Sequence, residues 1–180
     1  MTTEKRRILF KSFIESQFAY CPFLWMFHNR DLENKINELH ERALRIVYNN
    51  DNFSFDELLA LDNSFTIHHQ NIQKLAIEIY KCIHDLSPSF MKDIFINSNY
   101  NGPVIRTEKQ FYQPRVKTTF KGQESLTYFA PKVWNMVPEE YKSLGSIDKF
   151  KKEIKTWKPI GCPCRLCKSY VPGVGYINVI

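Results

Sequence analysis

The sequence has little glycine and no long apolar segment. It contains 6 Gly among 180 residues, and its longest apolar run, YCPFLWMF, has eight residues even when Pro22 is counted. A helix that crosses a bilayer needs about 20 apolar residues, so a membrane span is excluded. Residues 1–7 lead into an amphipathic stretch, whereas a secretory signal contains an apolar segment of about 7 to 15 residues. We therefore expect an intracellular protein of the nucleus or cytoplasm, with no membrane partner.

The residues of common catalytic centres are missing as well. A polymerase centre with two metal ions needs converging carboxylates, usually from two adjacent Asp residues, and no Asp-Asp pair occurs. The sequence also lacks a GxxxxGK[ST] loop that would hold a phosphate. His68 and His69 are adjacent, and neighbouring helical residues point about 100° apart, which favours capping or surface roles over one shared centre. The chain by itself is therefore predicted not to be an enzyme.

Basic residues are concentrated in the second part of the chain. Residues 1–100 hold 11 Lys and Arg against 13 Asp and Glu, whereas residues 101–180 hold 14 against 6. The net charge of +6 therefore comes from residues 101–180. Such an asymmetry favours a polyanionic partner for that part, and RNA or DNA is the first candidate.

Apolar residues recur at helical spacing through residues 1–100, which predicts a helical N-terminal part. A first helix of about 15 residues ends near Tyr20, and a long helix begins at Asp31. Thr66 is predicted to cap another long helix. Five apolar residues are predicted to form the buried stripe of the helix that begins at Asp31: Leu32, Ile36, Leu39, Ala43 and Ile46.

Residues 97–110 are rich in Asn and contain Gly102-Pro103, which is typical of a linker. The predicted boundary lies there, between a helical part, residues 1–100, and a basic part, residues 101–180. The alternation in residues 113–121 predicts a short strand, and Pro131 and Pro138 each suit the first turn of a short helix. The fold class is mainly α: a bundle of amphipathic helices with a short β or extended element and a coil-like, Cys-containing tail.

Two basic patches are candidates for contact with nucleic acid. In the first patch basic and aromatic residues alternate, and in the second, lysines cover the polar face of a helix that Ser146 caps. Lys and Arg neutralise phosphates, and exposed aromatic rings stack on unpaired bases. The alternative is an ordinary solvated face. The candidate residues are Arg106, Lys109, Arg115, Lys117 and Lys121 in the first patch, and Lys149, Lys151, Lys152, Lys155 and Lys158 in the second.

Three of the five cysteines form the motif Cys162-Pro-Cys164-Arg-Leu-Cys167. The C-x-x-C spacing lets two thiolates reach one tetrahedral zinc ion, and Cys162 could supply a third. A fourth ligand is missing locally, so Cys21, Cys82 or a His of the N-terminal part would have to complete the site. The alternative is a packed or redox-active thiol cluster without metal. Cys21 lies in an apolar aromatic run, which favours core packing over a nucleophile pair with His28.

Three segments, taken together, resemble one family. Residues 16–49 contain Tyr20, Cys21, Pro22 and Trp25 ahead of the RALR motif at residues 42–45. This arrangement resembles the segment after the thumb in reverse transcriptases of jockey-like non-LTR retrotransposons. The stretch TYFAPKVWNMVP at residues 127–138 is similar to a signature near the end of those open reading frames, and CPCRLCKSYVPGVGYI resembles the terminus of one animal branch. The resemblance covers residues 8–177.

The resemblance implies a C-terminal, post-catalytic fragment of an RNA-directed DNA polymerase. In the family this region follows an endonuclease and the fingers and palm of the polymerase, so the palm would be a partner in a full-length element. The implied role is to hold template RNA or target DNA. Two alternatives stay open: a protein-interaction module with an aromatic surface around Phe23, Leu24, Trp25 and Phe27, and a relic of a truncated element without function.

Overall fold

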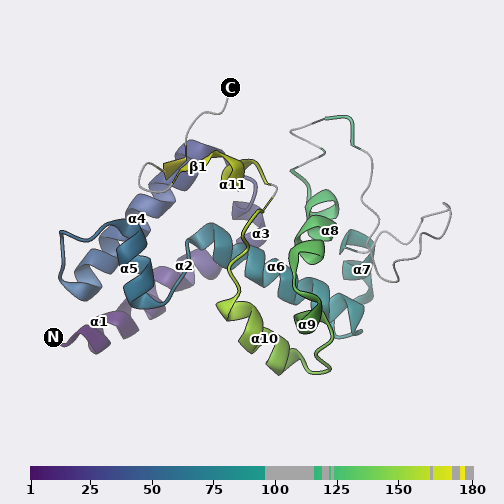
Figure 1. Cartoon of the computed structure of the whole chain (residues 1–180), viewed down its shortest axis with the longest axis horizontal. Coiled ribbons are helices and arrows are strands. Elements are labelled where there is room, and N and C mark those ends of the chain that lie inside the picture. The colour runs from purple at the N-terminus through teal and green to yellow at the C-terminus, as the bar shows by residue number, and fades with distance from the viewer. Residues whose placement is uncertain (96–115, 119–121, 123, 163, 172–174, 177–180) are drawn as a thin grey trace. The chain divides into compact units, whose positions relative to one another are not determined.

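The computed structural model describes residues 1–95, 116–118, 122, 124–162, 164–171 and 175–176 (Figure 1). These residues are mainly helical, which confirms the predicted fold class. No helix among them is both long and apolar enough to cross a membrane. The elements are α1 (Thr3–Leu9), η1 (Phe10–Glu15), α2 (Ser16–Ala19), α3 (Pro22–Trp25), α4 (Arg30–Tyr48), α5 (Phe55–Asp62), α6 (Ile67–Ile83), α7 (Ser89–Phe95), α8 (Leu126–Met136), α9 (Glu139–Lys142), α10 (Ile147–Thr156), α11 (Arg165–Ser169), β1 (Tyr170–Val171) and β2 (Gly175–Tyr176).

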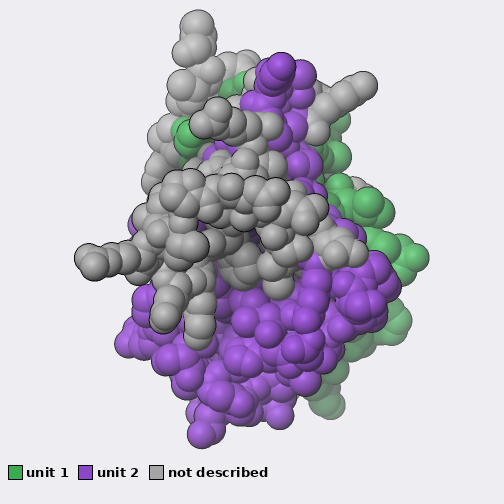
Figure 2. Space-filling view, turned by 90° about the vertical axis from the view of Figure 1, so that its right-hand side faces the viewer, with its two compact units in different colours: residues 1–71, 164–180 green, residues 72–163 purple. Residues whose placement is uncertain are grey.

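The chain forms two compact units, which Figure 2 shows in different colours. Unit 1 comprises residues 1–71 and 164–180, and unit 2 comprises residues 72–163. Both division points, after Asn71 and after Pro163, lie far from the Asn-rich stretch at residues 97–110. The boundary predicted in that stretch lies outside the described residues, and it stays a prediction.

Unit 1 is built on the packing of its N-terminal helical run against α4 and α5. The first helix extends without a break through α1, η1 and α2, close to the predicted end at Tyr20, and its middle turns have π-helical hydrogen bonding. Phe10 is buried in a cluster with Leu44 and Val47 of α4 and Leu58 of α5. Ser54 and Glu57 form a reciprocal capping box that starts α5, which satisfies two backbone donors at the helix end.

A buried carboxylate ties the three helical segments of unit 1 together. Asp62, at the end of α5, is 3% exposed and accepts hydrogen bonds from Arg7 Nε at 2.7 Å and from the Tyr48 hydroxyl at 2.6 Å. Arg7 also donates to the Asp62 carbonyl at 2.7 Å. Burial and this hydrogen bond raise the pKa of Tyr48 to about 12. The contact joins α1, α4 and α5. Because the Asp62 carboxylate has two hydrogen-bond donors, its buried charge is compensated.

The buried face of α4 differs from the predicted stripe. Ile36 and Ala43 are buried as predicted, but Leu32, Leu39 and Ile46 are 38%, 54% and 69% exposed. The prediction was wrong for these positions because the helix turns polar side chains inward instead: Glu33, Asn37 and His40 are all buried. Apolar spacing alone therefore did not identify which face of α4 packs inward.

Unit 2 has an apolar interior formed by α6, α8 and α10. The helix predicted after Thr66 buries Ile72, Leu75, Ala76 and Ile79, which recur at three- and four-residue spacing. The Tyr80 ring stacks on Phe150 of α10, with ring centroids 4.2 Å apart. Trp134 of α8 lies 6.1 Å from the same Phe150 ring, so one aromatic side chain joins the three helices.

Two details of the second part of the chain differ from the sequence analysis. The tail was expected to be coil, but it contains α11 and the antiparallel strands β1 and β2, in which Tyr170 pairs with Tyr176. Backbone pairing between residues close in the sequence forms these strands without a periodic apolar pattern. Pro131 lies inside α8 and does not begin a helix, because Ser125 caps the helix and its first residue, Leu126, lies five residues before Pro131. The predicted strand at residues 113–121 lies mostly outside the described residues, and residues 116–118 are not a strand.

Candidate metal centre and nucleic-acid interface

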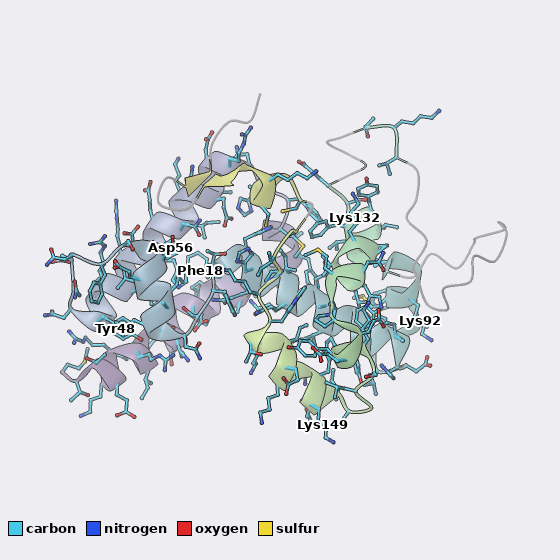
Figure 3. The ribbon with its side chains drawn as sticks, viewed as in Figure 1. Phe18, Tyr48, Asp56, Lys92, Lys132 and Lys149 are labelled. Carbon is cyan, nitrogen blue, oxygen red and sulfur yellow. The ribbon has the colours of Figure 1, made fainter. Side chains whose placement is uncertain are left out.

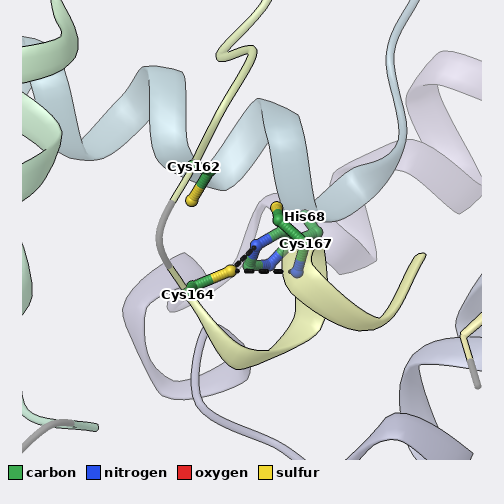
Figure 4. A group of neighbouring side chains, drawn as sticks. All are labelled: His68, Cys162, Cys164 and Cys167. Atoms are coloured by element: carbon green, nitrogen blue, oxygen red, sulfur yellow. Dashed lines mark hydrogen bonds between the residues drawn. The ribbon is translucent and has the colours of Figure 1, made fainter. Parts of the chain in front are cut away.

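Four metal-ligating side chains converge near the C-terminal motif. The ligand atoms of His68, Cys162, Cys164 and Cys167 all lie within 4.8 Å of one another (Figure 4). His68 and Cys162 are buried, with 1% and 4% of their surface exposed, and Cys164 and Cys167 are half-buried. One imidazole and three thiols form a donor set that could hold a metal ion, because soft thiolate and imidazole ligands suit transition metals.

The start of α6 fixes the position of His68. Thr66 caps this helix as predicted, since its hydroxyl accepts a hydrogen bond from the backbone N–H of His69 at 3.3 Å. His68 is thereby the second residue of the helix, and its Nε2 lies 3.2 Å from the Cys164 Sγ. The residues that were expected to cap or to face solvent therefore include one buried member of the cluster.

The cysteines are held by a helix start of their own. The Cys164 Sγ accepts a hydrogen bond from the backbone N–H of Cys167 at 3.2 Å, and the Cys164 carbonyl accepts from Lys168 N at the same distance. Cys164 thus occupies the capping position of α11, where a side-chain acceptor satisfies an unpaired backbone donor. This turn brings the two thiols of the C-x-x-C pair to the same side.

The observed separations fit one tetrahedral ion. With zinc–sulfur bonds of about 2.3 Å and zinc–nitrogen bonds of about 2.0 Å, tetrahedral ligands lie about 3.5 to 3.8 Å apart. The 3.2 Å between His68 Nε2 and Cys164 Sγ and the 4.8 Å limit on all pairs bracket these values. Only small side-chain movements separate this arrangement from a coordinated one.

The surroundings of His68 raise the pKa of its imidazole. Burial lowers the pKa of His68, but the hydrogen bond with Cys164 and the negative charges of Cys164 and Glu33 raise it overall. Glu33 is fully buried in α4, and its carboxylate lies 2.6 Å from His28 Nε2. A divalent cation would take the place of the proton among these groups, since metal binding to thiols and imidazoles releases protons.

The structure answers the question of the missing fourth ligand. The sequence left Cys21, Cys82 or an N-terminal His as candidates, and His68 is the residue brought to the three cysteines. The interpretation of His68 as a capping or surface residue was wrong, because the thiols fold over the first turn of α6. The sequence signals were limited to an incomplete cysteine triad and a His pair that begins two residues after the capping Thr66, and neither specifies which distant residue completes the group.

The expectation for Cys21 was also wrong. Cys21 is exposed, and its backbone has a left-handed conformation with φ +46° directly before Pro22. His28, its suggested partner, instead pairs with Glu33.

The second basic patch lies on a well-anchored helix. Phe150 and Ile154 of α10 are fully buried, while Lys149, Lys152 and Lys155 are exposed. Gln73 of α6 donates hydrogen bonds to the backbone carbonyls of Trp157 and Lys155, at 2.7 and 3.3 Å, and so caps the end of α10. Figure 3 shows Lys149 extending outward from this helix.

Few of these lysines are neutralised by carboxylates. Among the described residues, Lys151 alone of the five pairs with an acid, Asp148, and the N–O distance is 3.9 Å. At 100° per residue, Lys151, Lys152 and Lys155 fall within about 100° of arc, opposite Phe150 and Ile154. A row of lysines on one face, of which only Lys151 has a carboxylate partner, could contact several phosphates at once.

The first basic patch is described only in part. Lys117 is exposed. Arg106, Lys109, Arg115 and Lys121 lie outside the described residues, and their role stays a prediction.

Comparison with known proteins yields no relative. No protein-family model, no curated protein and no solved structure matches this chain.

Proposed function

We propose that this chain is a nucleic-acid-binding module without catalytic activity, and that a structural zinc ion completes its fold. The observation that carries the first part is the lysine face of α10, which is exposed and mostly unpaired while Phe150 and Ile154 anchor the opposite face. Unit 2 as a whole holds 15 Lys and Arg against 9 Asp and Glu. A rigid basic surface of this kind attracts polyanions and positions their phosphates.

The proposed parentage is the C-terminal, post-catalytic part of a jockey-like non-LTR retrotransposon reverse transcriptase. Its support is the order of the three resembling segments. The RALR motif contributes the buried Ala43 and Leu44, and the segment 127–138 contributes Trp134 to the interior of unit 2. Translation of the genomic DNA upstream of the Met1 codon tests this parentage. An in-frame polymerase palm is expected, and an unrelated exon would contradict it.

Zinc is the proposed metal because three thiols and one imidazole match its structural sites. Zinc would be held by His68, Cys162, Cys164 and Cys167, and it would supply folding free energy without chemistry of its own. Elemental analysis after expression in zinc-replete medium is expected to give one zinc per chain. A content below about 0.1 per chain would reject the site, since structural thiolate sites hold zinc tightly.

Binding to labelled RNA and DNA over a series of salt concentrations tests the nucleic-acid function. If α10 neutralises about four phosphates, the log–log salt slope should be about −2.8 on single strands and about −3.6 on duplex. Sequence preference should be weak, because phosphate contacts carry no base information. Replacing Lys151, Lys152 and Lys155 with Glu should weaken binding to all sequences and flatten the slope.

A matched control separates this effect from a change in net charge. Lys5, Lys11 and Lys35 are exposed lysines of unit 1, and replacing them with Glu changes the total charge by the same amount. This variant should keep most of the affinity and the salt slope. Equal losses in both variants would show that α10 is an ordinary solvated face. The same preparation should not extend a primed template above a buffer control.

A second candidate function is protein interaction. Unit 1 exposes large apolar side chains along its first helices, with Phe13 at 69%, Tyr20 at 76% and Leu24 at 81%. Exposed apolar groups of this density mark interaction surfaces. Self-association that is independent of salt, together with no binding to RNA or DNA, would favour this candidate over the first.

A further inference from the structure

A fifth potential ligand lies beside the cluster of four. The His69 Nε2 is 3.9 Å from the Cys167 Sγ, while the neighbouring His68 Nε2 is 3.2 Å from the Cys164 Sγ. Each imidazole of the adjacent pair therefore approaches a different thiol of the C-x-x-C motif. The two imidazole rings are tilted by 46° with centroids 6.2 Å apart, so they do not stack on each other.

Unit 1 contains four potential ligands without Cys162, and His69 would have to move toward the group of ligand atoms that lie within 4.8 Å of one another. His68, His69, Cys164 and Cys167 all belong to unit 1. Two imidazoles and two thiolates form a common tetrahedral zinc set. The 3.9 Å between His69 Nε2 and Cys167 Sγ is close to the separation of about 3.5 Å expected for a nitrogen and a sulfur on one zinc ion.

We propose that the site binds its metal through two interchangeable ligand sets, in which His69 takes the place of Cys162. The proposal rests on the zinc site of the proposed function. One set is His68, Cys162, Cys164 and Cys167, and the other is His68, His69, Cys164 and Cys167. In the exchange, the bond between zinc and the Cys162 sulfur breaks, the thiolate takes one proton from water, and the lone pair of His69 Nε2 forms a new bond to zinc.

The exchange has a defined chemical consequence. A zinc ion with three thiolates carries a net charge of −1, and with two thiolates it is neutral. No electron is transferred, so the exchange needs no oxidant. Cys162 becomes a neutral thiol while the metal stays bound. The identity of the fourth ligand thus decides whether Cys162 can be chemically modified without loss of zinc.

Zinc titration of four variants of the full chain tests the proposal. A structural zinc site derives its affinity from four ligands, so loss of one without a replacement should weaken binding on the order of 100- to 1,000-fold. Cys162→Ser should weaken zinc binding less than about 10-fold, because His69 replaces the thiolate. His69→Ala alone should have a similarly small effect. The double variant Cys162→Ser/His69→Ala and the double variant Cys164→Ser/His69→Ala each leave three of the ligands, and both should show the full loss.

Cobalt(II) gives a readout of the ligands themselves. The intensity of the thiolate-to-cobalt absorption rises with the number of thiolates, so the wild-type chain should show more of this band than Cys162→Ser. The Cys162→Ser chain should keep the visible bands of four-coordinate cobalt. In the double variant with His69→Ala those bands should disappear.

A measurement on the wild-type chain covers the case in which Cys162→Ser fails to fold. Iodoacetamide treatment of the zinc-loaded chain, followed by native mass analysis and peptide mapping, should yield chains alkylated at Cys162 in addition to the exposed Cys21 that still hold one zinc. Loss of zinc from every chain alkylated at Cys162, or loss of binding in Cys162→Ser equal to that in the Cys162→Ser/His69→Ala double variant, would overturn the exchange while leaving the zinc site standing. A wild-type chain that binds no zinc would overturn the proposed zinc site and the exchange with it.

Discussion

The interiors of unit 1 and unit 2 are stabilised in different ways. Of the eight buried polar or charged side chains among the described residues, seven belong to unit 1, and Gln73 alone belongs to unit 2. Unit 1 also contains His68, Cys164 and Cys167 of the candidate metal centre. Unit 2 is filled by aliphatic and aromatic side chains around Phe150.

The two units also differ in net charge. Unit 1 holds ten Lys and Arg and ten Asp and Glu, so its net charge is zero, and the +6 of the chain resides in unit 2. Unit 1 has charged side chains in internal pairs such as Arg7 with Asp62. The excess charge of unit 2 includes exposed lysines such as Lys149 and Lys152. The comparison teaches that unit 1 should respond to metal and pH, and unit 2 to salt and polyanions.

Removal of the metal is expected to give the largest difference between the units. A structural zinc site contributes on the order of 10 kcal/mol, which is comparable to the whole stability of a domain. Chelation should therefore abolish amide-exchange protection in α4 and α5, while α8 and α10 retain it. Hydrogen-exchange mass spectrometry on the full chain measures both sets of segments at once. A chain with Cys164 and Cys167 replaced by Ser is the control, and it should be insensitive to the chelator.

Truncation of the aromatic centre of unit 2 should have the next largest effect. Phe150 is fully buried against Tyr80 and Trp134, so Phe150→Ala should cost about 3 to 5 kcal/mol. The loss should be the same with and without zinc. Urea unfolding followed by tryptophan fluorescence measures it, and the exposed neighbour Lys149→Ala should stay within about 0.5 kcal/mol of wild type. A zinc-dependent loss would mean that the units are not stabilised separately.

Acid should destabilise unit 1 through His40. This side chain is 1% exposed, stacks on Phe10 with centroids 5.8 Å apart, and meets Phe55 edge-on. Burial lowers the pKa of His40 from 6.5 to about 4. Between pH 6.5 and about pH 4, His40 therefore binds a proton in the unfolded chain but not in the folded chain. The contribution to stability is present above pH 6.5 and is lost as the pH falls to about 4, and it amounts to about 3 kcal/mol.

Urea unfolding at several pH values, compared between the wild type and His40→Leu, isolates this contribution. Leucine cannot take up a proton, so the difference in stability between the two chains should change by about 3 kcal/mol across the interval. The metal ligands titrate alike in both chains and cancel in the comparison. A constant difference across the interval would show that His40 is not the acid-sensitive group.

The smallest expected effect concerns the corrected face of α4. Leu39 is 54% exposed and Leu44 is fully buried. Leu39→Ala should therefore change the stability by less than about 0.5 kcal/mol, whereas Leu44→Ala should cost about 2 to 5 kcal/mol. Thermal or urea unfolding of the two variants measures the contrast. Equal losses of stability would show that Leu39 lies on the buried face of α4, as the sequence pattern predicted.

The sequence by itself determined the helical class, most helix positions and the distribution of charge. Local signals carried these conclusions: Thr66 marks a helix start, and the three- and four-residue spacing in α6 and α10 marks the faces that are buried. Net charge follows from residue counts alone. The C-x-x-C spacing likewise indicated two metal ligands, because neighbouring thiols on one short turn are close in any fold.

The tertiary structure decided which polar groups are buried and which distant residue meets the cysteines. The inward face of α4 depends on partners far along the chain, such as Phe10 and Phe55 around His40. His68 and Cys164 are separated by 96 positions, and no local pattern encodes a contact at that distance. Burial of His68 becomes favourable only when the thiols are present to pair with it, since an unpaired buried polar group is costly.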